Sequence, residues 1–508
     1  MAVEVVNWKT NTNFYHRGML TIYFAVFIAF LNAAINGYDN SIFNNMATLN
    51  SFGNAFTGKP DFQSSSDKYA LTAAMIQIGE MAGCLVVGYI SDTFGRRGAL
   101  MVGSIIVITG VVLELATHDL NVFIFGRFVI GFGVSQVTTA APTYTLEVAH
   151  PQFRSWATGI YNTGWGVGSV PASIILLGTY VDTSDFAWRL PVGVQALYSG
   201  IVLVGCLFIP ESPRWLMSKG REDEARKFLV HYHGNDIEDH PIVELTMSEM
   251  REALADEIRQ NSGSYMALFK GRPMIYRFWL IIAIAFFSQY AGNWLAGGFT
   301  VITNAQFGFK TAEQQLGLSI ATSALGFIFA QIGAAYCERI GRRPLIIYGT
   351  LGFIICWTLT LICLAIYNNN TDLTGVGIAG WVIEQIFGLI YAFSWNAINA
   401  LYPVEILPYS ARAKGMAMCQ FFINLSGVIQ SYVLIYGVNT WEWKFDSFYL
   451  FFNAFALVIV YFFFPETQGY SLEKIVQIFD DPNPVKKSIT DVRVNVEATE
   501  IHVEKAKV

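Results

Sequence analysis

The chain has 508 residues, of which 53% are hydrophobic and only 14% charged, and its formal net charge is -6. This composition is too apolar for an ordinary soluble protein of such length and indicates a protein that spans a lipid bilayer. Nucleic acid is not expected as a partner, because no basic stripe stands apart from the apolar segments.

Roughly twelve apolar segments follow one another, each about twenty residues long and so able to cross the ~30 Å hydrocarbon core as a helix. The first begins near Leu20 and continues too far for a signal peptide. The segments centre near residues 30, 80, 107, 133, 167 and 199, and then near 290, 326, 356, 390, 424 and 454. We therefore predict an all-α membrane protein with twelve transmembrane helices in two six-helix, pseudo-symmetric bundles.

A polar stretch separates the two sets of segments, and its charged runs predict amphipathic helices lying under the membrane. The polar tail at the C-terminus is expected to be largely disordered. The predicted parts are a cytoplasmic N-terminal segment (1–19), an N-terminal six-helix bundle (20–209), a cytoplasmic helical linker (210–274), a C-terminal six-helix bundle (275–465) and a cytoplasmic tail (466–508).

Lysine and arginine are unevenly distributed between the loops on the two sides of the predicted membrane. They gather in alternate loops, which predicts that these loops and both termini are cytoplasmic. In this topology the sequon Asn369-Asn370-Thr371 lies outside, and Asn369 is a candidate glycosylation site.

Three short motifs occur twice, in the same order and at an offset of roughly 250 residues. Asp92-Thr-Phe-Gly-Arg96-Arg97 corresponds to Glu338-Arg-Ile-Gly-Arg342-Arg343. Glu147 and Arg154 correspond to Glu405 and Arg412, and Pro210-Glu211-Ser212 corresponds to Pro465-Glu466-Thr467. Such a repeat indicates a duplicated six-helix half with pseudo-twofold symmetry.

These motifs, together with Gly37-Tyr38-Asp39, Gly126-Arg127-Phe128 and Tyr402-Pro403-Val404-Glu405, resemble the sugar porter family of the major facilitator superfamily over residues 23–474. The resemblance implies the fold of that superfamily with intracellular helices, a neutral sugar as substrate and alternating access. Within the family the chain looks most like the fungal lactose and cellodextrin permease branch, through Tyr161–Trp165, Ser288–Asn293 and Leu401–Pro408. That branch also contains hexose and pentose carriers, so the resemblance does not identify the sugar.

Asp39 falls within the first predicted helix, where an ionised carboxylate costs ~2.5 to 3.5 kcal/mol unless it has a partner or a proton. Arg127 is the basic residue well inside the first six segments, and the resemblance places its helix beside the first. We expect Arg127 to hold Asp39 ionised, so that protonation of Asp39 couples protons to transport. The alternative is a static ion pair or a cap on a broken helix. Glu80 is either a second titrating group or a hydrogen-bonding partner for a neighbouring helix, and Glu384 is expected to reach water.

Sugar hydroxyl groups require hydrogen-bonding side chains on rigid helices. Gln289 and Asn293 are four residues apart and therefore share a helix face. Each amide could instead hold two helices together. The full set of candidate sugar-binding residues is Asn162, Gln289, Asn293, Trp395, Asn396, Asn399 and Asn424.

The paired charges of the repeated motifs predict a cytoplasmic gate whose salt bridges form when the inner mouth is closed. The positive-inside rule alone would explain the arginines, but it would not explain why acidic residues recur at the same spacing in both halves. The gate candidates are Asp92, Arg96, Arg97, Glu147, Arg154, Glu211, Glu338, Arg342, Arg343, Glu405, Arg412 and Glu466.

The sequence therefore predicts a monomeric carrier, in the plasma membrane, that imports a neutral mono- or disaccharide by proton symport. A passive uniporter and a sugar-sensing receptor are the alternatives. No enzyme, cofactor or metal site is expected, because no nucleophile-base pair, metal-ligand cluster or phosphate loop occurs. The six cysteines are typical of small core residues, and the glycines of Gly164–Gly168 predict close helix packing.

Overall fold

Long apolar stretches of the sequence form long helices in the computed structural model. It describes residues 15–59, 62, 66–151, 153, 157, 160–259, 268–309, 311–370, 372–468, 475 and 478–490, and every secondary-structure element assigned in these ranges is helical. Contacts divide the chain into two units. The first contains Met1–Ser264, Leu316–Ser323 and Gly427–Tyr432, and the second contains Tyr265–Gln315, Ala324–Ser426 and Val433–Val508.

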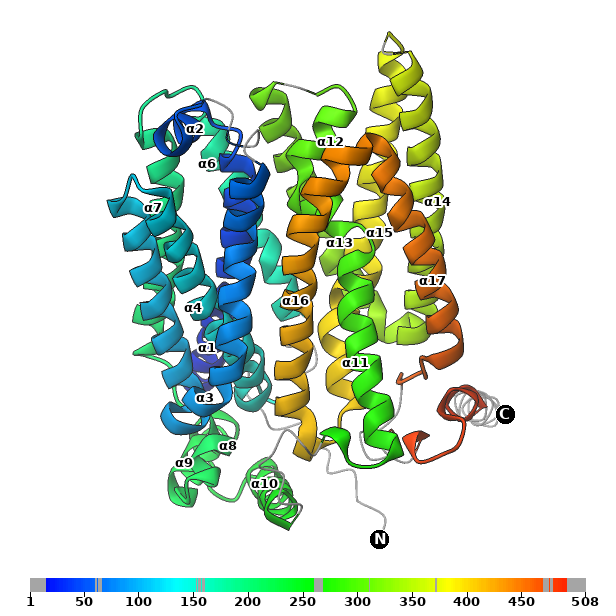
Figure 1. The fold of residues 1–508 in the computed structure, drawn as a ribbon. Coiled ribbons are helices and arrows are strands. Elements are labelled where there is room, and N and C mark those ends of the chain that lie inside the picture. Colours follow the sequence, from blue (N-terminus) through cyan, green and yellow to red (C-terminus); the bar gives the residue numbers. More distant parts are fainter. Residues whose placement is uncertain are drawn as a thin grey trace. The chain divides into compact units, whose positions relative to one another are not determined.

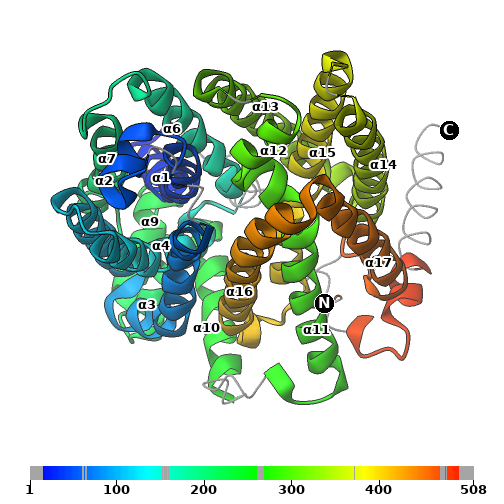
Figure 2. The ribbon, with the colours of Figure 1, turned by 45° about the horizontal axis from the view of Figure 1, so that its top comes forward.

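In the first unit the long helices run side by side (Figure 1). Figure 2 shows α1 lying among α4, α6 and α7, and these are helices that it contacts. The helices are α1 (Arg17–Met46), α2 (Asn50–Thr57), α3 (Ser66–Ala116), α4 (Leu120–Val148), α6 (Trp165–Thr179) and α7 (Phe186–Cys206), with a 3-10 turn, η2 (Asn162–Gly164), before α6.

The contact between α1 and α6 depends on small residues. A side-chain carbon at Gly168 would overlap the backbone carbonyl of Ala34, so only glycine lets the two backbones approach this closely. The close packing predicted for the Gly164–Gly168 segment is therefore confirmed.

The second unit contains a helix that is interrupted midway. Helix α11 ends at Tyr290, Gly292 adopts a φ of 115°, and the chain continues through a π-helical turn, η4. Such turns are frequent at functional sites. The elements are α11 (Arg272–Tyr290), η4 (Trp294–Gly298), α12 (Thr300–Gln306), α13 (Ala312–Ile340), α14 (Arg342–Asn369), α15 (Thr374–Ile406), α16 (Tyr409–Trp441), η5 (Glu442–Asp446) and α17 (Ser447–Phe463).

Within the described residues, 9 helical segments are long and apolar enough to cross a membrane. Two of them, Asp67–Leu115 with 49 residues and Lys414–Phe463 with 50, are long enough for two spans each. Trp165–Thr179 is a shorter apolar helix. Counting both double-length segments twice and adding the shorter helix gives the twelve spans that the sequence predicts.

Three shorter helices follow the last span of the first unit: α8 (Pro213–Ser218), α9 (Glu222–Tyr232) and α10 (Pro241–Arg259). Ser212 caps α8 by accepting a hydrogen bond from the N–H of Trp215, and Pro213 occupies the first turn. In α9 the buried residues Ala225, Phe228 and Leu229 share one face, so the helix is amphipathic.

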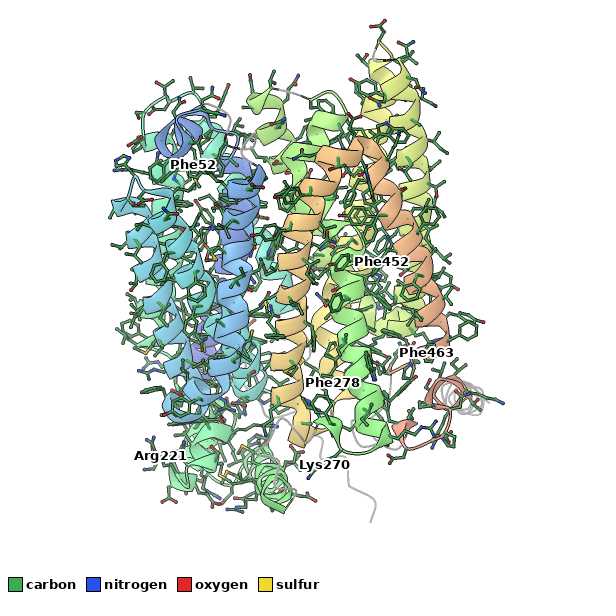
Figure 3. All side chains as sticks on the ribbon, in the orientation of Figure 1. Phe52, Arg221, Lys270, Phe278, Phe452 and Phe463 are labelled. Carbon is green, nitrogen blue, oxygen red and sulfur yellow. The ribbon has the colours of Figure 1, made fainter. Side chains whose placement is uncertain are left out.

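The two ends of the first unit differ in chemistry. Figure 3 shows Arg221, between α8 and α9, at the end of the unit opposite Phe52. Phe52 packs against the rings of Phe62, Phe123 and Trp188 at centroid distances of 4.9, 5.5 and 6.1 Å. We call the end that carries Arg221 the arginine end of the first unit, and the end of α14 that carries Arg342 the arginine end of the second.

Candidate functional site

A half-buried carboxylate, that of Glu211, closes the turn between the two spans of α3. Gly95 adopts a φ of 86° there, and a side-chain carbon at this position would overlap the Glu211 carboxylate. Glu211 Oε1 accepts hydrogen bonds from the backbone N–H groups of Arg96 at 3.0 Å and Arg97 at 3.2 Å. Burial raises the pKa of the Glu211 carboxyl, while these N–H groups and that of Ser212 act in the opposite direction.

The side chain of Arg96 joins α3 to α4. Its Nε lies 3.2 Å from Glu147 Oε2, and its Nη1 lies 3.6 Å from Asp92 Oδ1. The Ser212 hydroxyl donates to the same Glu147 carboxylate, and Arg97 Nη1 donates to the carbonyl of Ile209 at 3.2 Å. These contacts define the first arginine cluster, which contains Asp92, Arg96, Arg97, Glu147, Glu211 and Ser212.

The second unit repeats the main contacts of this arrangement. At Gly341 φ is 96°, and the N–H groups of Arg342 and Arg343 donate to Glu466 at 3.0 and 3.1 Å. Arg342 Nη2 lies 2.7 Å from Glu405 Oε1, and the Thr467 hydroxyl donates to Glu405 Oε2 at 2.5 Å. The second arginine cluster contains Arg342, Arg343, Glu405, Glu466 and Thr467.

A tyrosine completes each cluster. Tyr144 donates to the carbonyl of Pro210 at 2.7 Å, and Tyr402 donates to the carbonyl of Pro465 at 3.0 Å. Tyr144 stands three residues before Glu147, and Tyr402 stands three residues before Glu405. The duplicated sequence motifs therefore form duplicated hydrogen-bond networks, each inside one unit.

The three remaining gate candidates are Arg154, Glu338 and Arg412. Arg412 Nη2 donates to the carbonyl of Leu407 at 3.4 Å. Arg154 lies outside the described residues, as does the side chain of Glu338.

Two candidate amides lie where α11 gives way to η4, and one of them bonds a tryptophan. Trp294 Nε1 donates to Gln289 Oε1 at 2.7 Å. With its amide nitrogen turned toward the helix, Asn293 donates to the carbonyls of Ser288 and Gln289, both at 2.8 Å. The hydroxyl of Tyr391 on α15 donates to the carbonyl of Ser288 at 3.0 Å, so α15 borders this amide group.

The candidates on α15 and α16 have different surroundings. Asn396 and Asn399 are half-buried, and Asn399 Oδ1 is buried without a hydrogen-bond partner in the described structure. Asn424 is buried and accepts from Gln420 at 3.5 Å, while its Nδ2 has no hydrogen-bond partner within the described ranges. Trp395 is 1% exposed and donates to Thr350 of α14 at 3.2 Å, so its indole packs between helices. The side chain of Asn162 lies outside what the structure describes.

In the first unit, Arg127 of α4 lies against α1, where it contacts the backbone at Asp39 and not the Asp39 carboxylate. Nη1 and Nη2 lie 3.4 and 3.5 Å from the carbonyl oxygen of Asp39, and the guanidinium lies 5.1 Å from the centre of the Phe43 ring. Asp39 is 0% exposed, and neither carboxylate oxygen has a hydrogen-bond partner among the described residues. The expected charge partners are thus neighbours, without the direct guanidinium–carboxylate bond.

The sequence matches a known family over most of its length. Residues 24–479 fit the family described as Sugar (and other) transporter. The chain belongs to this family. It is 27% identical over 475 residues to the MFS-type transporter criB of Aspergillus cristatus, covering 91% of this chain and 94% of the relative. It is 25% identical to the high glucose sensor RGT2 of Saccharomyces cerevisiae, covering 92% of this chain but 62% of the sensor.

The fold agrees with this family membership. The structure of the proton:xylose symporter XylE bound to 6-bromo-6-deoxy-D-glucose matches 91% of this chain and 99% of its own, with a TM-score of 0.74 at 20% identity. The fold is therefore that of the major facilitator superfamily. The sugar transporter family and this fold together identify the chain as a multi-pass membrane transporter of sugars rather than an enzyme.

Two features of this sugar transporter escape the sequence patterns. Glu114, near the end of α3, is 0% exposed and interacts electrostatically with Arg127. A chain of amides joins α1 to α3, because Asn40 donates to Asn36 at 2.5 Å and accepts from Gln77 at 3.0 Å. The four-residue spacing of Asn36 and Asn40 indicates that the two amides share a helix face, but not that Gln77 of α3 bonds to them.

The expectation that Glu384 of the transporter reaches water is wrong. Its side chain is 2% exposed, both carboxylate oxygens lack hydrogen-bond partners in the described chain, and it interacts electrostatically with buried Asp446. The ring of Trp357 lies 5.1 Å from Phe387 and 5.2 Å from Tyr449, one turn beyond Glu384 and Asp446. Because Trp357 belongs to α14, this helix packs against both α15 and α17, and Glu384 is buried within the packed helices instead of reaching solvent.

Asn369, the candidate glycosylation site of the transporter, is exposed at the last residue of α14. Arg342 begins the same helix, so the two residues occupy opposite ends of it. Thr371 of the sequon lies outside the described residues.

Proposed function

We propose that the chain imports a neutral mono- or disaccharide together with protons, by alternating access between two six-helix bundles. The observation that carries the proton coupling is the carboxylate of Asp39, buried beside Arg127 within a membrane span. An acid in this position is expensive to bury unless it exchanges a proton or has a partner. The similarity to XylE, described as a proton:xylose symporter, supports the proposal.

The proposed topology places both arginine ends and both termini in the cytoplasm. We further propose that the transporter lies in the plasma membrane and works as a monomer. The positive-inside rule favours this orientation. Asn369, at the far end of α14 from Arg342, would then lie outside and could accept a glycan. The proposed bundles are residues 20–209 and 275–465, with residues 210–274 as linker and 466–508 as tail.

We propose the amides of the second unit as sugar contacts: Gln289, Asn293, Asn396, Asn399 and Asn424. Gln289 and Asn293 lie beside the break in α11, where the helix cannot satisfy all its own polar groups. Asn162 remains a proposed contact through the family resemblance alone. Trp395 is proposed as a residue that supports the site, because its indole bonds Thr350.

Uptake in a host that lacks its own sugar carriers tests the proposed function. Radiolabelled D-glucose, D-xylose, D-galactose, L-arabinose, lactose and cellobiose are supplied with and without a protonophore. We expect at least one sugar to accumulate above its external concentration, and the protonophore to return the ratio to about 1, because the proton gradient supplies ~2.3 kcal/mol per 100 mV.

Two other results would favour the alternatives. Equilibration to a ratio of about 1, with no effect of the protonophore, would indicate a passive uniporter. No uptake of any of these sugars would favour a receptor, an alternative raised by the similarity to RGT2.

Substitution of Gln289 tests the proposed sugar site. Gln289→Ala removes an amide that can bond sugar hydroxyls, and one or two hydrogen bonds of ~0.5 to 1.5 kcal/mol each correspond to a rise in KM of about tenfold. Trp395→Phe is the control, because it reduces the buried ring and removes its bond to Thr350 but leaves the five proposed amide contacts in place. It should lower the amount of folded transporter and leave KM within about twofold. Equal changes in KM for both variants would contradict the assignment.

A further inference from the structure

Three buried carboxyl groups interact electrostatically with one buried guanidinium in the first unit. Asp39 and Glu114 are 0% exposed, and Glu80 and Arg127 are 2% exposed. The acids come from α1 and from both spans of α3, and the base comes from α4. Arg127 interacts electrostatically with Glu114, Asp39 and Glu80.

Glu114 is held against α4 at the residue before Arg127. A side-chain carbon built on Gly126 would lie 2.7 Å from Glu114 Cγ, so the glutamate side chain occupies the space that the glycine leaves open. Neither carboxylate oxygen of Glu114 has a hydrogen-bond partner in the described part of the chain. The charge of Glu114 is therefore balanced by Arg127 or by a proton.

Other titratable groups near this cluster have contacts of their own, such as Tyr69 of α3, which stacks on Phe43 at a centroid distance of 5.6 Å. Tyr38, next to Asp39, donates to the carbonyl of Pro191 and packs against Tyr198 of α7. Arg189 of α7 pairs with Asp185. Helix α6 contains no titratable side chain. Among the described residues of the first unit, Arg127 is the one arginine or lysine with a buried side chain, and it interacts with all three acids.

Charge balance decides how many of the acids can be ionised together. A buried ion without a counter-ion costs several kcal/mol, so protonation of Asp39 would be opposed if it left Arg127 unbalanced. An ionised Glu114 removes this cost, because it neutralises Arg127 while Asp39 carries the proton. When Asp39 releases the proton, the two carboxylates share the guanidinium, and their repulsion favours binding of the next proton.

We propose that Glu114 is the counter-ion of Arg127 while Asp39 holds the transported proton, and that it thereby sets the pH at which this carrier loads. The inference rests on the proposed proton symport and adds a positioning residue to it. One proton binds the Asp39 carboxylate from the water on one side and leaves to the water on the other. Glu114 keeps its charge throughout.

Uptake by purified transporter in liposomes, measured from acidic to neutral pH, tests the proposal. The probe is the sugar taken up fastest in the panel above. In Glu114→Gln, Asp39 becomes the main counter-ion of Arg127 and stays ionised to lower pH. We expect the pH of half-maximal uptake to move about one unit in the acid direction, a tenfold change in proton affinity. Glu114→Asp, which keeps a carboxylate, should move it less.

The controls separate this role from a structural one. Sugar exchange at equal concentrations on both sides reports folded transporter, and Glu80→Gln removes another buried acid of α3. A uniform loss of rate with no change of midpoint in Glu114→Gln, or an equal shift in Glu80→Gln, would overturn the proposal. If Glu114→Gln does not fold, Glu114→Ala, which also removes the carboxylate, is measured in its place, and an unchanged midpoint in that variant would overturn the proposal as well. A wild-type rate that does not depend on pH would instead refute the proposed symport itself.

Discussion

Replacement of Asp39 by Asn should abolish sugar accumulation and preserve sugar exchange. Asn matches the shape of Asp but cannot exchange a proton, and the side chain is fully buried beside Arg127. One coupled proton at 100 mV is worth ~2.3 kcal/mol, or about fifty-fold accumulation. The internal-to-external ratio in Asp39→Asn should therefore fall to about 1, while counterflow of labelled sugar continues. Both quantities are measured in the same vesicles.

The control for this experiment is another acid of the first unit. Asp185 pairs with Arg189 at 3.7 Å with a side chain 45% exposed, so Asp185→Asn should accumulate sugar as the wild type does. Continued accumulation in Asp39→Asn that still depends on the pH gradient would show that another group carries the proton. Loss of both accumulation and counterflow would instead indicate that the pocket itself is damaged.

The sequence predicts the fold well because its main determinants are local. Each span needs about twenty apolar residues, and the turns at Gly95 and Gly341 need a glycine with positive φ beside an arginine pair. The duplicated acids also meet the duplicated arginines, since Glu147 reaches Arg96 and Glu405 reaches Arg342. Short motifs with matched spacing thus specify tertiary contacts in each half of the chain.

The sequence fails where the direction of a side chain depends on packing. Glu114 stands near the end of an apolar stretch, a position typical of residues at the membrane surface, yet its side chain fills the space that Gly126 leaves open and interacts with Arg127. Glu384 is misjudged for the same reason. Trp395 and Asn399 are four residues apart on α15, yet the indole of Trp395 turns to Thr350 of α14. Periodicity identifies a helix face but not the neighbour that this face meets.

The hydroxyl groups of Ser212 and Thr467 make contacts that the sequence does not reveal, for a different reason. Both directly follow the glutamate of the third repeated motif, and each donates to the glutamate of the second. The pattern of charges does not reveal them, because a hydroxyl beside an acid is common in loops. Their shared role emerges when the two clusters are compared, and it extends the proposed gate beyond its charged members.

Neutralisation of both cluster glutamates should open the transporter toward the cytoplasm, if the proposed gate is correct. Glu147 and Glu405 are 8% and 14% exposed in their side chains, so these salt bridges are better shielded than surface pairs. In Glu147→Gln with Glu405→Gln, Arg96 and Arg342 lose their charge partners in the closed state. A loss of about 1 kcal/mol per cluster would raise the population of the open state more than tenfold.

The rate at which a maleimide, supplied from the cytoplasmic side, labels a cysteine placed at Ala400 measures this shift. Ala400 lies on α15 next to Asn399, and Cys363 is replaced by serine, since the other native cysteines are buried. Glu224→Gln serves as the control, because Glu224 pairs with Arg221 with half of its side chain in solvent. We expect labelling of the double variant to be at least tenfold faster than that of the control. Equal rates would mean that the clusters hold helix ends together within each half and do not control access to the sugar.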